Sequence, residues 1–363
     1  MMLTSFSCSG NPLWQFFVTN NPVLDKLYCY GSSLLTKLDL TGTANLTVLD
    51  CSYSPKLATI TGLDECYELK SLDVSGCAFT KLDGLDRLDN LEVLHAHHTK
   101  LTSIGVTGKS KLALLYLHEN PDLKAVWAFE NSSLKVLSCS FCPSLQQILC
   151  FDCALADLNV TGDEALMDLS CGGNANLADI TGLEQCVSIT TLDCESCNIS
   201  DLSAVKNMGN LESLYVNNNR LAALDVSGCS KLDYIDCCRN QLRGEGMDRL
   251  VQSLPERTED NMGYFYVLHN TDEGNTMTNA HIVIAKNKYW LPKKYNGSGW
   301  ETMTAAVNGD VNADGSVNIT DINVLIDAIL CGGDGWNDAL DVNGDGTVNI
   351  SDVNAVIGLI LYQ

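Results

Sequence analysis

The sequence has few basic residues and no long apolar run. Lysine and arginine number 22 against 45 aspartates and glutamates, so the formal net charge is -23. Such a charge repels nucleic-acid phosphates and anionic lipid, and it attracts divalent cations. No apolar run approaches the roughly 20 residues of a membrane-spanning helix, and the first residues lack the basic and apolar regions of an export signal. Nucleic acid and membrane surfaces are therefore poor partner classes.

A repeat of about 22 residues runs through the first two thirds of the chain. Its leading residues are Leu24, Leu46, Leu69, Leu91, Leu112, Leu134, Leu166, Ile189, Leu211 and Leu232. Between Leu134 and Leu166 the gap is 32 residues, about one and a half repeats, and the register there is undetermined. Alternating side chains, as in NLTVLDCSYS, predict a short strand. A second strand-like half follows some 11 residues later, so one coil has two ribs, and stacked coils share a continuous core.

The recurring pattern LxxLxLxxN/C resembles the leucine-rich repeat. It is matched by Leu112, Leu115, Leu117 and Asn120, by Leu211, Leu214, Val216 and Asn219, and by Leu232, Ile235, Cys237 and Asn240. The resemblance covers roughly residues 3–242 and implies an α/β repeat fold, a leucine-rich repeat solenoid with two strand-like ribs per coil. It also implies that the asparagine or cysteine of each turn bonds backbone groups and forms a ladder between coils.

The 17 cysteines follow this repeat. Cys8, Cys29, Cys51, Cys139, Cys171, Cys194 and Cys237 occupy an inward strand position, and Cys77, Cys142, Cys197 and Cys229 occupy the ladder position. The CxxC pairs Cys139/Cys142, Cys150/Cys153 and Cys194/Cys197 could also be zinc or redox motifs. Because the repeat already demands small buried residues at both positions, we expect most of these thiols to be free.

Residues 244–304 interrupt the repeat. GMDRLVQSLPERT predicts a helix that ends at Pro255, GYFYVLHN a strand, TNAHIVIAKNKYW a second helix, and LPKKYNGSGW a final strand or turn. Exposed solenoid ends need covering, so we expect residues 1–243 to form the solenoid and residues 244–304 its α+β C-terminal cap. The N-terminal end already fits the repeat, which suggests that an upstream segment, with an export signal or a lipid anchor, has been removed.

Two nearly identical strings, DVNADGSVNITD from Asp310 and DVNGDGTVNISD from Asp341, start 31 residues apart. Asp, Asn and Asp at positions one, three and five place hard oxygens around one point, and the glycine at position six permits a sharp turn. Position seven supplies a backbone carbonyl, and position twelve is aspartate instead of the usual glutamate. Each string leads into an amphipathic helix, with Thr320 or Ser351 predicted as its N-cap. The predicted apolar stripes are Ile322, Leu325, Ile326 and Ile329, and Val353, Val356, Ile357 and Ile360.

No matching helix precedes either loop, so each unit is half of an EF-hand. The pair resembles the type I dockerin, the module by which secreted proteins of anaerobic bacteria bind cohesin domains. The resemblance covers about residues 308–363 and implies a small all-α domain over residues 305–363 that binds Ca2+ at two sites. The implied ligands are Asp310, Asn312, Asp314, Ser316 and Asp321, and Asp341, Asn343, Asp345, Thr347 and Asp352.

Loop positions ten and eleven help to select the cohesin in such modules and are often small or hydroxylated. Here they are Ile319 and Thr320, and Ile350 and Ser351. The apolar residue at position ten departs from this pattern and puts a standard cohesin partner in doubt. Extracellular calcium modules bind at roughly 10⁻⁴ to 10⁻³ M, which suits calcium outside the cell. The protein is therefore expected to be extracellular or on the cell surface.

Aromatic and histidine side chains mark a second candidate surface. The outward positions of the predicted concave strands carry Tyr28, Tyr30, His95, His97, Tyr116, His118, Tyr215 and Tyr234. We expect a protein or glycan ligand on this face. His97 and His118 lie one coil apart, about 4.8 Å, so a metal ion could bridge them, but no carboxylate or third histidine occupies a matched position.

Aspartates also recur beside the inward leucines, and paired carboxylates could be catalytic. They are Asp39, Asp50, Asp73, Asp193, Asp225 and Asp236. Their spacing by whole or half coils favours a repeated surface role, and the sequence has no nucleophile elbow, phosphate loop or zincin motif. The leading hypothesis is a secreted or cell-surface, adhesin-like binding protein without enzymatic activity, tethered or assembled through the calcium module. The alternative is a carbohydrate-binding or hydrolase-associated subunit of an extracellular glycan-degrading complex.

Overall fold

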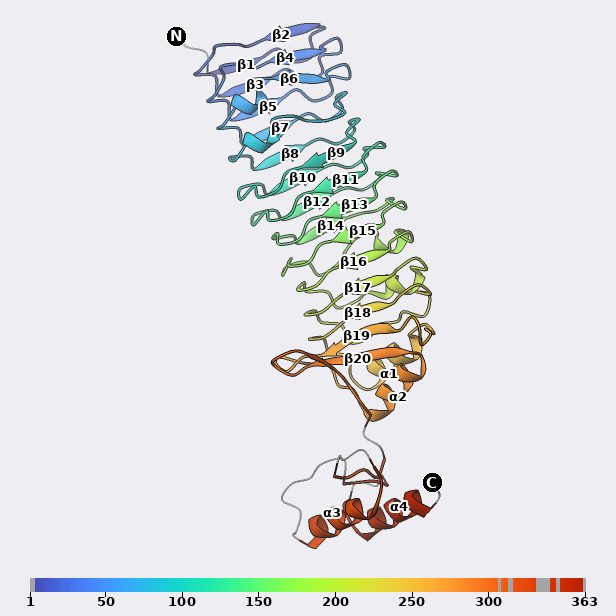
Figure 1. The fold of residues 1–363 in the computed structure, drawn as a ribbon. Helices are drawn as coiled ribbons and strands as arrows, with labels where there is room; N and C mark the ends of the chain where they lie inside the picture. Colours follow the sequence, from blue (N-terminus) through green and yellow to red (C-terminus); the bar gives the residue numbers. More distant parts are fainter. Residues whose placement is uncertain (1–3, 306–307, 313–315, 331–339, 344–346, 362–363) are drawn as a thin grey trace. The chain divides into compact units, whose positions relative to one another are not determined.

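The computed structural model describes residues 4–305, 308–312, 316–330, 340–343 and 347–361. The chain divides into two compact units, one of Met1–Met277 and Ala285–Glu301 and the other of Thr278–Ile284 and Thr302–Gln363. The larger unit is a stack of coils with parallel strands, and the smaller contains a pair of helices (Figure 1). No helix within these described ranges is long and apolar enough to cross a membrane.

The strands of the larger unit form three sheets. The first sheet contains, in spatial order, β1 (Ser5–Ser7), β3 (Lys26–Tyr28), β5 (Val48–Asp50), β7 (Ser71–Asp73), β8 (Val93–His95), β10 (Leu114–Tyr116), β12 (Val136–Ser138) and β14 (Asp157–Asn159). The second sheet contains β9 (Ser103–Gly105), β11 (Ala125–Trp127), β13 (Gln147–Leu149), β15 (Asp168–Ser170), β16 (Thr191–Asp193), β17 (Ser213–Tyr215), β18 (Tyr234–Asp236), β19 (Gly263–Leu268), β20 (Trp290–Tyr295) and β21 (Trp300–Thr302). The third sheet contains β2 (Gln15–Phe17), β4 (Lys37–Asp39) and β6 (Thr59–Thr61).

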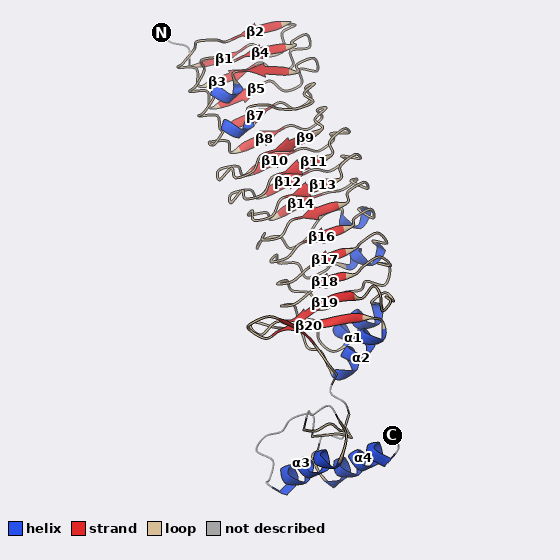
Figure 2. Ribbon diagram, in the orientation of Figure 1, coloured by secondary structure: helices blue, strands red, loops and turns tan. Residues whose placement is uncertain are grey.

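The described helices are short 3-10 helices in the coils and four α-helices after them. The 3-10 helices are η1 (Leu63–Glu65), η2 (Leu85–Arg87), η3 (Leu183–Gln185) and η4 (Ser203–Asn207). The α-helices are α1 (Glu245–Ser253), α2 (Asn279–Asn287), α3 (Ile319–Leu330) and α4 (Ile350–Leu361). Figure 2 separates the strands from the helices by colour.

Each coil crosses the larger unit twice, and the middle side chain of the three-residue strands in the coils points into the core. In β8 and β9 these residues are Leu94 and Ile104, which are 0% and 4% exposed. The residues on either side of them are less buried, so the apolar core lies between the two crossings. Burial of each such side chain stabilises the stack by about 1.5 to 3 kcal/mol. The predicted solenoid with two ribs per coil is confirmed.

The two crossings of a coil are versions of one unit of about 11 residues. From β8 to β15 the strands begin at residues 93, 103, 114, 125, 136, 147, 157 and 168, and they fall alternately in the first and the second sheet. The gap between Leu134 and Leu166 therefore holds three half-coils. Leu134 leads β12 in the first sheet, whereas Leu166 leads β15 in the second. The leading strand of the repeat thus changes sheets across the gap.

Side chains in the turns form the predicted ladder between coils. Asn120 donates from Nδ2 to the carbonyls of Ala96 (2.9 Å) and Leu117 (2.6 Å), and its Oδ1 accepts the N–H of Thr99 at 2.7 Å. The same pair of donated bonds is made by Asn131, Asn174, Asn219, Asn240 and Asn275. Ladder cysteines place their thiols 3.1 to 3.4 Å from carbonyl oxygens, as found for Cys77, Cys142, Cys153, Cys197 and Cys229.

The cysteines of the CxxC pairs are accounted for by the same geometry. Cys139, Cys150 and Cys194 are fully buried behind the strands, and the second cysteine of each pair bonds a backbone carbonyl as a ladder residue. The thiols within the described ranges are free, as predicted, and Cys331 lies outside those ranges. The pairs therefore contribute to the packing of the coils.

Asp163 replaces asparagine at one ladder position. Its side chain is fully buried, and Oδ1 accepts the N–H of Cys142 at 2.8 Å. Oδ2, where an asparagine would carry its donor, has no hydrogen-bond partner among the described residues. Burial raises the pKa of Asp163 to about 8. The carboxyl group is therefore protonated at neutral pH.

The cap follows the predicted order of helix, strand, helix and strand. α1 ends two residues before Pro255 and buries Met247, Leu250 and Val251. β19 pairs in parallel with β18, and β20 pairs in parallel with β19. The cap thus continues the second sheet beyond the last regular coil.

Candidate functional site

The smaller unit contains α3 and α4, each preceded by one of the acidic loops (Figure 1). Its core contains Val311, Val317, Ile322, Leu325, Val353 and Val356, with Ile329, Leu340, Val342, Val348, Leu359 and Ile360 packed against it. Six of the eight predicted stripe residues belong to this core. Ile326 and Ile357 do not, and they are 37% and 38% exposed.

The last aspartate of each loop closes that loop through backbone hydrogen bonds. Asp321 Oδ1 accepts the N–H groups of Val311 (2.8 Å) and Asn312 (3.1 Å), and Oδ2 accepts that of Asn318 (2.9 Å). Asp352 repeats the pattern with Asn343 at 3.1 Å and Asn349 at 2.9 Å. Both side chains are fully buried.

These backbone N–H donors stabilise the ionised form of Asp321. Burial raises the pKa of Asp321, but hydrogen bonds from the backbone N–H groups of Asn318, Asn312 and Val311 lower it by more, so the net shift is downward. The carboxylate stays ionised at neutral pH. The first loop therefore ends on a buried negative group.

The helix caps differ from the prediction. α3 and α4 begin at Ile319 and Ile350, so the residue before each is the N-cap. Asn318 Oδ1 accepts the N–H of Thr320 at 2.9 Å, and Asn349 Oδ1 accepts that of Ser351 at 2.8 Å. The prediction that Thr320 and Ser351 are the N-caps is wrong, because the asparagine at loop position nine already provides the capping oxygen.

The predicted calcium ligands that the structure describes are Asp310, Asn312, Ser316 and Asp321 in the first loop, and Asp341, Asn343, Thr347 and Asp352 in the second. Asp314 and Asp345 lie outside the described residues. Within the described part of the chain, no group of three or more His, Cys, Asp or Glu side chains could hold a metal ion. The predicted ligands that the structure describes offer carboxylate, amide and hydroxyl or carbonyl oxygens. Oxygens of this kind are the ligands that Ca2+ prefers, so the residues fit that ion.

Apolar side chains at equivalent positions of the two helices remain exposed. Ile319 and Ile350, at loop position ten, are each 63% exposed. Leu330 and Leu361, eleven residues later, are 77% and 73% exposed. Together with Ile326 and Ile357 they lie at i, i+7 and i+11, which is one stripe of a helix. Each helix thus presents an apolar stripe outside the core.

Residues 308–361 match the family of the dockerin type I domain. The C-terminal module is a type I dockerin domain. Dockerins of this type bind calcium and partner with cohesin-type proteins, and neither the dockerin nor the leucine-rich repeat is a catalytic module. The dockerin follows a leucine-rich repeat solenoid in the same chain.

Solved leucine-rich repeat structures are similar to this chain. The functional domain of InlJ from Listeria monocytogenes, described as including a cysteine ladder, has 23% identity and a TM-score of 0.36, and covers 74% of this chain and 61% of its own. The LRIM1/APL1C complex has 15% identity and a TM-score of 0.36, with 95% and 75% covered. The chain thus spans less than two thirds of the InlJ domain's length. No curated protein matches the sequence.

The aromatic and histidine residues of the solenoid lie on two sheets. Tyr28, Tyr30, His95, His97, Tyr116 and His118 belong to strands of the first sheet or follow them directly, whereas Tyr215 and Tyr234 belong to the second. The expectation of one shared face is wrong, because the leading strand of the repeat changes sheets between Leu134 and Leu166. The two sets form separate surfaces.

The histidines of the first sheet form a stacked group. The rings of His97 and His118 are parallel, with centroids 4.3 Å apart, and His95 stacks on Tyr116 at 4.8 Å. Burial lowers the pKa of His97 and of His118, and the proximity of His118 lowers that of His97 further. Both are therefore neutral at pH 7. The described residues contain no group of three or more His, Cys, Asp or Glu side chains that could hold a metal ion, and a metal ion bridging His97 and His118 stays a hypothesis.

The aromatic surface of the second sheet is larger than the sequence indicated. The ring of Tyr234 lies 4.8 Å from that of Tyr215 and 5.2 Å from that of Tyr266. Trp300 lies 4.9 Å from Tyr266 and 5.4 Å from Tyr295. Tyr266, Tyr295 and Trp300 belong to the cap and have no repeat spacing to reveal them. Only the parallel pairing of β19 with β18 brings them to the tyrosines of the repeats.

The recurring aspartates bond the backbone of their own turns. Each accepts the N–H of the residue two positions later, at 2.9 to 3.3 Å. They are Asp39, Asp50, Asp73, Asp193, Asp225 and Asp236. Such Asx turns explain why an aspartate is the last residue of the strand in so many coils.

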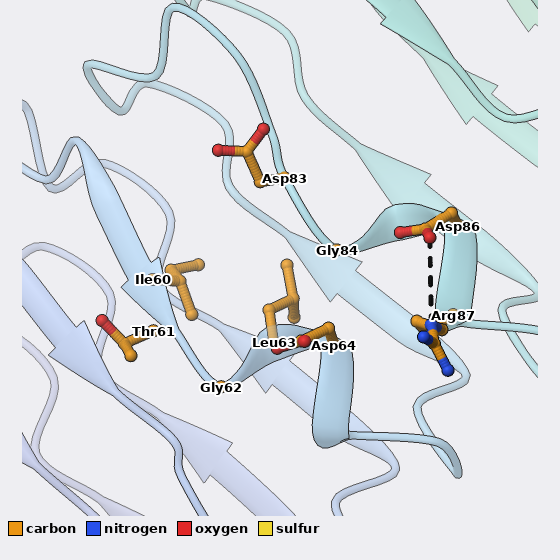
Figure 3. A pocket seen from close by; sticks show the side chains of 9 residues that line it. All are labelled: Ile60, Thr61, Gly62, Leu63, Asp64, Asp83, Gly84, Asp86 and Arg87. Atoms are coloured by element: carbon orange, nitrogen blue, oxygen red, sulfur yellow. Dashed lines mark ion pairs between the residues drawn. The ribbon is translucent and has the colours of Figure 1, made fainter.

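An open pocket of about 450 Å³ lies beside η1 and η2 (Figure 3). It is lined by the exposed carboxylates of Asp64, Asp83 and Asp86, and Arg87 Nε lies 3.9 Å from Asp86. Gly62 leads into η1 with a φ of 74°, and a Cβ there would lie 2.6 Å from the backbone nitrogen of Thr41. Because glycine has no side chain, the adjacent coils can approach closely at Gly62, on the wall of this pocket.

Proposed function

We propose that this protein is an exported, adhesin-like binding protein without catalytic activity, which its dockerin tethers to a partner while its solenoid recognises a ligand. The repetition within the dockerin carries the proposal: two loop-helix units each combine a buried aspartate with an exposed isoleucine. The proposed division is solenoid at 1–243, cap at 244–304 and dockerin at 305–363. An extracellular location follows from the weak calcium affinity typical of modules outside the cell.

Each loop is proposed to hold one calcium ion. The ligands would be Asp310, Asn312, Asp314, Ser316 and Asp321 in the first loop, and Asp341, Asn343, Asp345, Thr347 and Asp352 in the second. When bound, calcium neutralises carboxylates that otherwise repel one another. At a hundredfold excess over its dissociation constant, each ion adds about 2.7 kcal/mol to the free energy of unfolding.

Calorimetric titration of the full chain with calcium chloride is expected to give two ions per chain. Asp310→Asn and Asp341→Asn should each weaken one site at least about tenfold, because each removes one charged ligand. Asp327→Asn is the matched control, since Asp327 is an exposed carboxylate on α3 outside the loop. The variant that combines Asp310→Asn with Asp341→Asn tests both sites at once. If it took up two calcium ions with unchanged affinity, the assignment of these ligands would be contradicted.

The partner is proposed to bind across the exposed stripes, through Ile319 and Thr320, and Ile350 and Ser351. Because the two stripes are alike, either could serve, so the double variant Ile319→Asp/Ile350→Asp is needed. Whichever stripe the partner uses, the double variant replaces its buried isoleucine with a charged aspartate, which should weaken binding at least about thirtyfold. The measurement is interferometry against a panel of immobilised type I cohesin domains in calcium.

Val324→Asp is the matched control for this test. Val324 is apolar and 37% exposed, but it lies on another side of α3. Its replacement should leave partner binding within about twofold, and a chelator should abolish binding of every variant. Cohesin binding that persists in chelator, or that Ile319→Asp/Ile350→Asp leaves unchanged, would remove the proposed mode of tethering.

A further inference from the structure

The outward face of β16 to β19 alternates carboxylates with tyrosine rings. In the parallel register Asp193 pairs with Tyr215, Tyr215 with Asp236, and Asp236 with Tyr266. Neighbouring strands are about 4.8 Å apart, so acid, ring, acid and ring follow one another across four strands. Tyr234 stands beside this column, in contact with both tyrosines. We call these five residues the acidic-aromatic column.

The rings of the column continue into the cap. Trp300 meets Tyr266 edge to face, with an interplanar angle of 88°, and is 38% exposed. His269 and Tyr295 stack at 4.7 Å, and their ring centroids lie 6.0 Å and 5.4 Å from that of Trp300. The face therefore offers a continuous series of rings beside carboxylates.

The carboxylates of the column have no cationic partner in the described ion pairs. Asp193 accepts bonds from Ser170 Oγ (3.0 Å) and the N–H of Glu195 (3.1 Å), and Asp236 accepts the N–H of Cys238 (3.3 Å) and a bond from the Cys238 thiol. Burial, together with the charges of Glu195 and Glu273, raises the pKa of Asp236 to about 6, although hydrogen bonds from Cys238 act to lower it. A cation placed over the column would relieve this crowding. Lys293 lies at the end of the column, where it pairs with Tyr266 in the register of β19 and β20.

We propose that the acidic-aromatic column binds an extended basic peptide, with arginine or lysine side chains placed over Asp193 and Asp236 and between the tyrosine rings. The inference rests on the proposed function, in which the solenoid presents the ligand-binding surface. Cations above tyrosine faces gain about 0.5 to 2 kcal/mol each. A neutral glycan could stack on the same rings, but it would leave the two carboxylates uncompensated.

The spacing of the column selects a probe. Asp193 and Asp236 are two strands apart, about 9.6 Å. In a polyproline II helix, residues three apart lie on one side and about 9.3 Å from each other. A peptide of four Arg-Pro-Pro triplets therefore presents basic side chains at the spacing of the two carboxylates.

The test is the fluorescence anisotropy of this labelled peptide with the full chain in calcium at low salt. Asp193→Asn/Asp236→Asn should weaken binding at least about tenfold. The matched control is Asp50→Asn/Asp73→Asn in the first sheet, which removes the same charge and retains the same kind of turn bond, to Ser52 and Ser75. This control should weaken binding less than about twofold. Removing two charges from the first sheet lowers only the general attraction between the acidic chain and the basic peptide.

Equal weakening by both pairs of variants, or absence of peptide binding, would overturn the proposal. So would displacement of the peptide by a neutral oligosaccharide whose own binding is insensitive to salt, because the face would then be a glycan site. Calcium uptake and cohesin binding are measured on the same proteins. If they persist while the peptide fails to bind, this inference alone fails, and if they fail while the peptide binds, the tethering proposal alone fails.

Discussion

Asp163→Asn is expected to raise the free energy of unfolding of the solenoid by about 2 to 4 kcal/mol at pH 7. Only Oδ1 of the buried Asp163 carboxyl group has a hydrogen-bond partner, the N–H of Cys142, whereas Oδ2 has none among the described residues. An asparagine is of nearly the same size, and its Nδ2 would donate to backbone carbonyls as those of Asn120 and Asn174 do. Urea unfolding followed by circular dichroism measures the change.

The pH dependence of stability should change in the same variant. Burial raises the pKa of Asp163 from 3.8 to about 8, so the folded chain holds a proton that the unfolded chain releases above about pH 4. The contribution of this group to stability is therefore complete below pH 4 and is lost as pH rises toward 8. Asp163→Asn should flatten the stability profile over that window.

Asn174→Asp provides the reverse experiment one half-coil away. It places a carboxyl at a buried ladder position that now carries an amide. The expected result is a loss of stability at pH 7 that acid partly restores. If Asp163→Asn were less stable than the unaltered chain at pH 7, the account of Asp163 as a neutral buried acid would be wrong.

Asp321→Ala is expected to unfold the dockerin even in millimolar calcium. The substitution leaves the N–H groups of Val311, Asn312 and Asn318 without their acceptor, at about 1 to 3 kcal/mol for each donor that stays buried. A module of this size has only about 3 to 5 kcal/mol of stability from its core. Differential scanning calorimetry should lose the calcium-dependent transition and keep that of the solenoid.

Two variants define what this result means. Asp327→Ala removes an exposed carboxylate from the same helix and should change stability by less than about 0.5 kcal/mol. Asp352→Ala should reproduce the effect of Asp321→Ala, since Asp352 closes the second loop in the same way. A calcium-dependent transition that survives in Asp321→Ala would show that the buried carboxylate is dispensable.

The sequence predicted the repeat well because its signal is periodic. Leucines such as Leu115 recur in register and fall in the core, and Asn120, Asn219 and Asn240 form the ladder bonds expected of them. The order of elements in the cap also followed from local patterns. The two calcium-type loops stood out because a 12-residue string occurs twice.

Features that depend on long-range pairing did not follow from the sequence. Tyr266 and Trp300 join the aromatic face only because the cap extends the second sheet. Asn318 takes the cap position from Thr320 because both are capping residues within three positions of each other, and spacing alone does not decide between them. The change of sheet after Leu134 could be recognised only once the half-coil had been seen as the unit.

Because one crossing of a coil can replace the other, this architecture can grow by single crossings. An insertion of about 11 residues would leave the leucine core and the hydrogen-bond ladder continuous, yet it would move the side chains of every later leading strand to the opposite face. Duplication of one such segment could thus redirect which face meets a ligand without a new fold. The step of 32 positions from Leu134 to Leu166 has the length that such an event would leave.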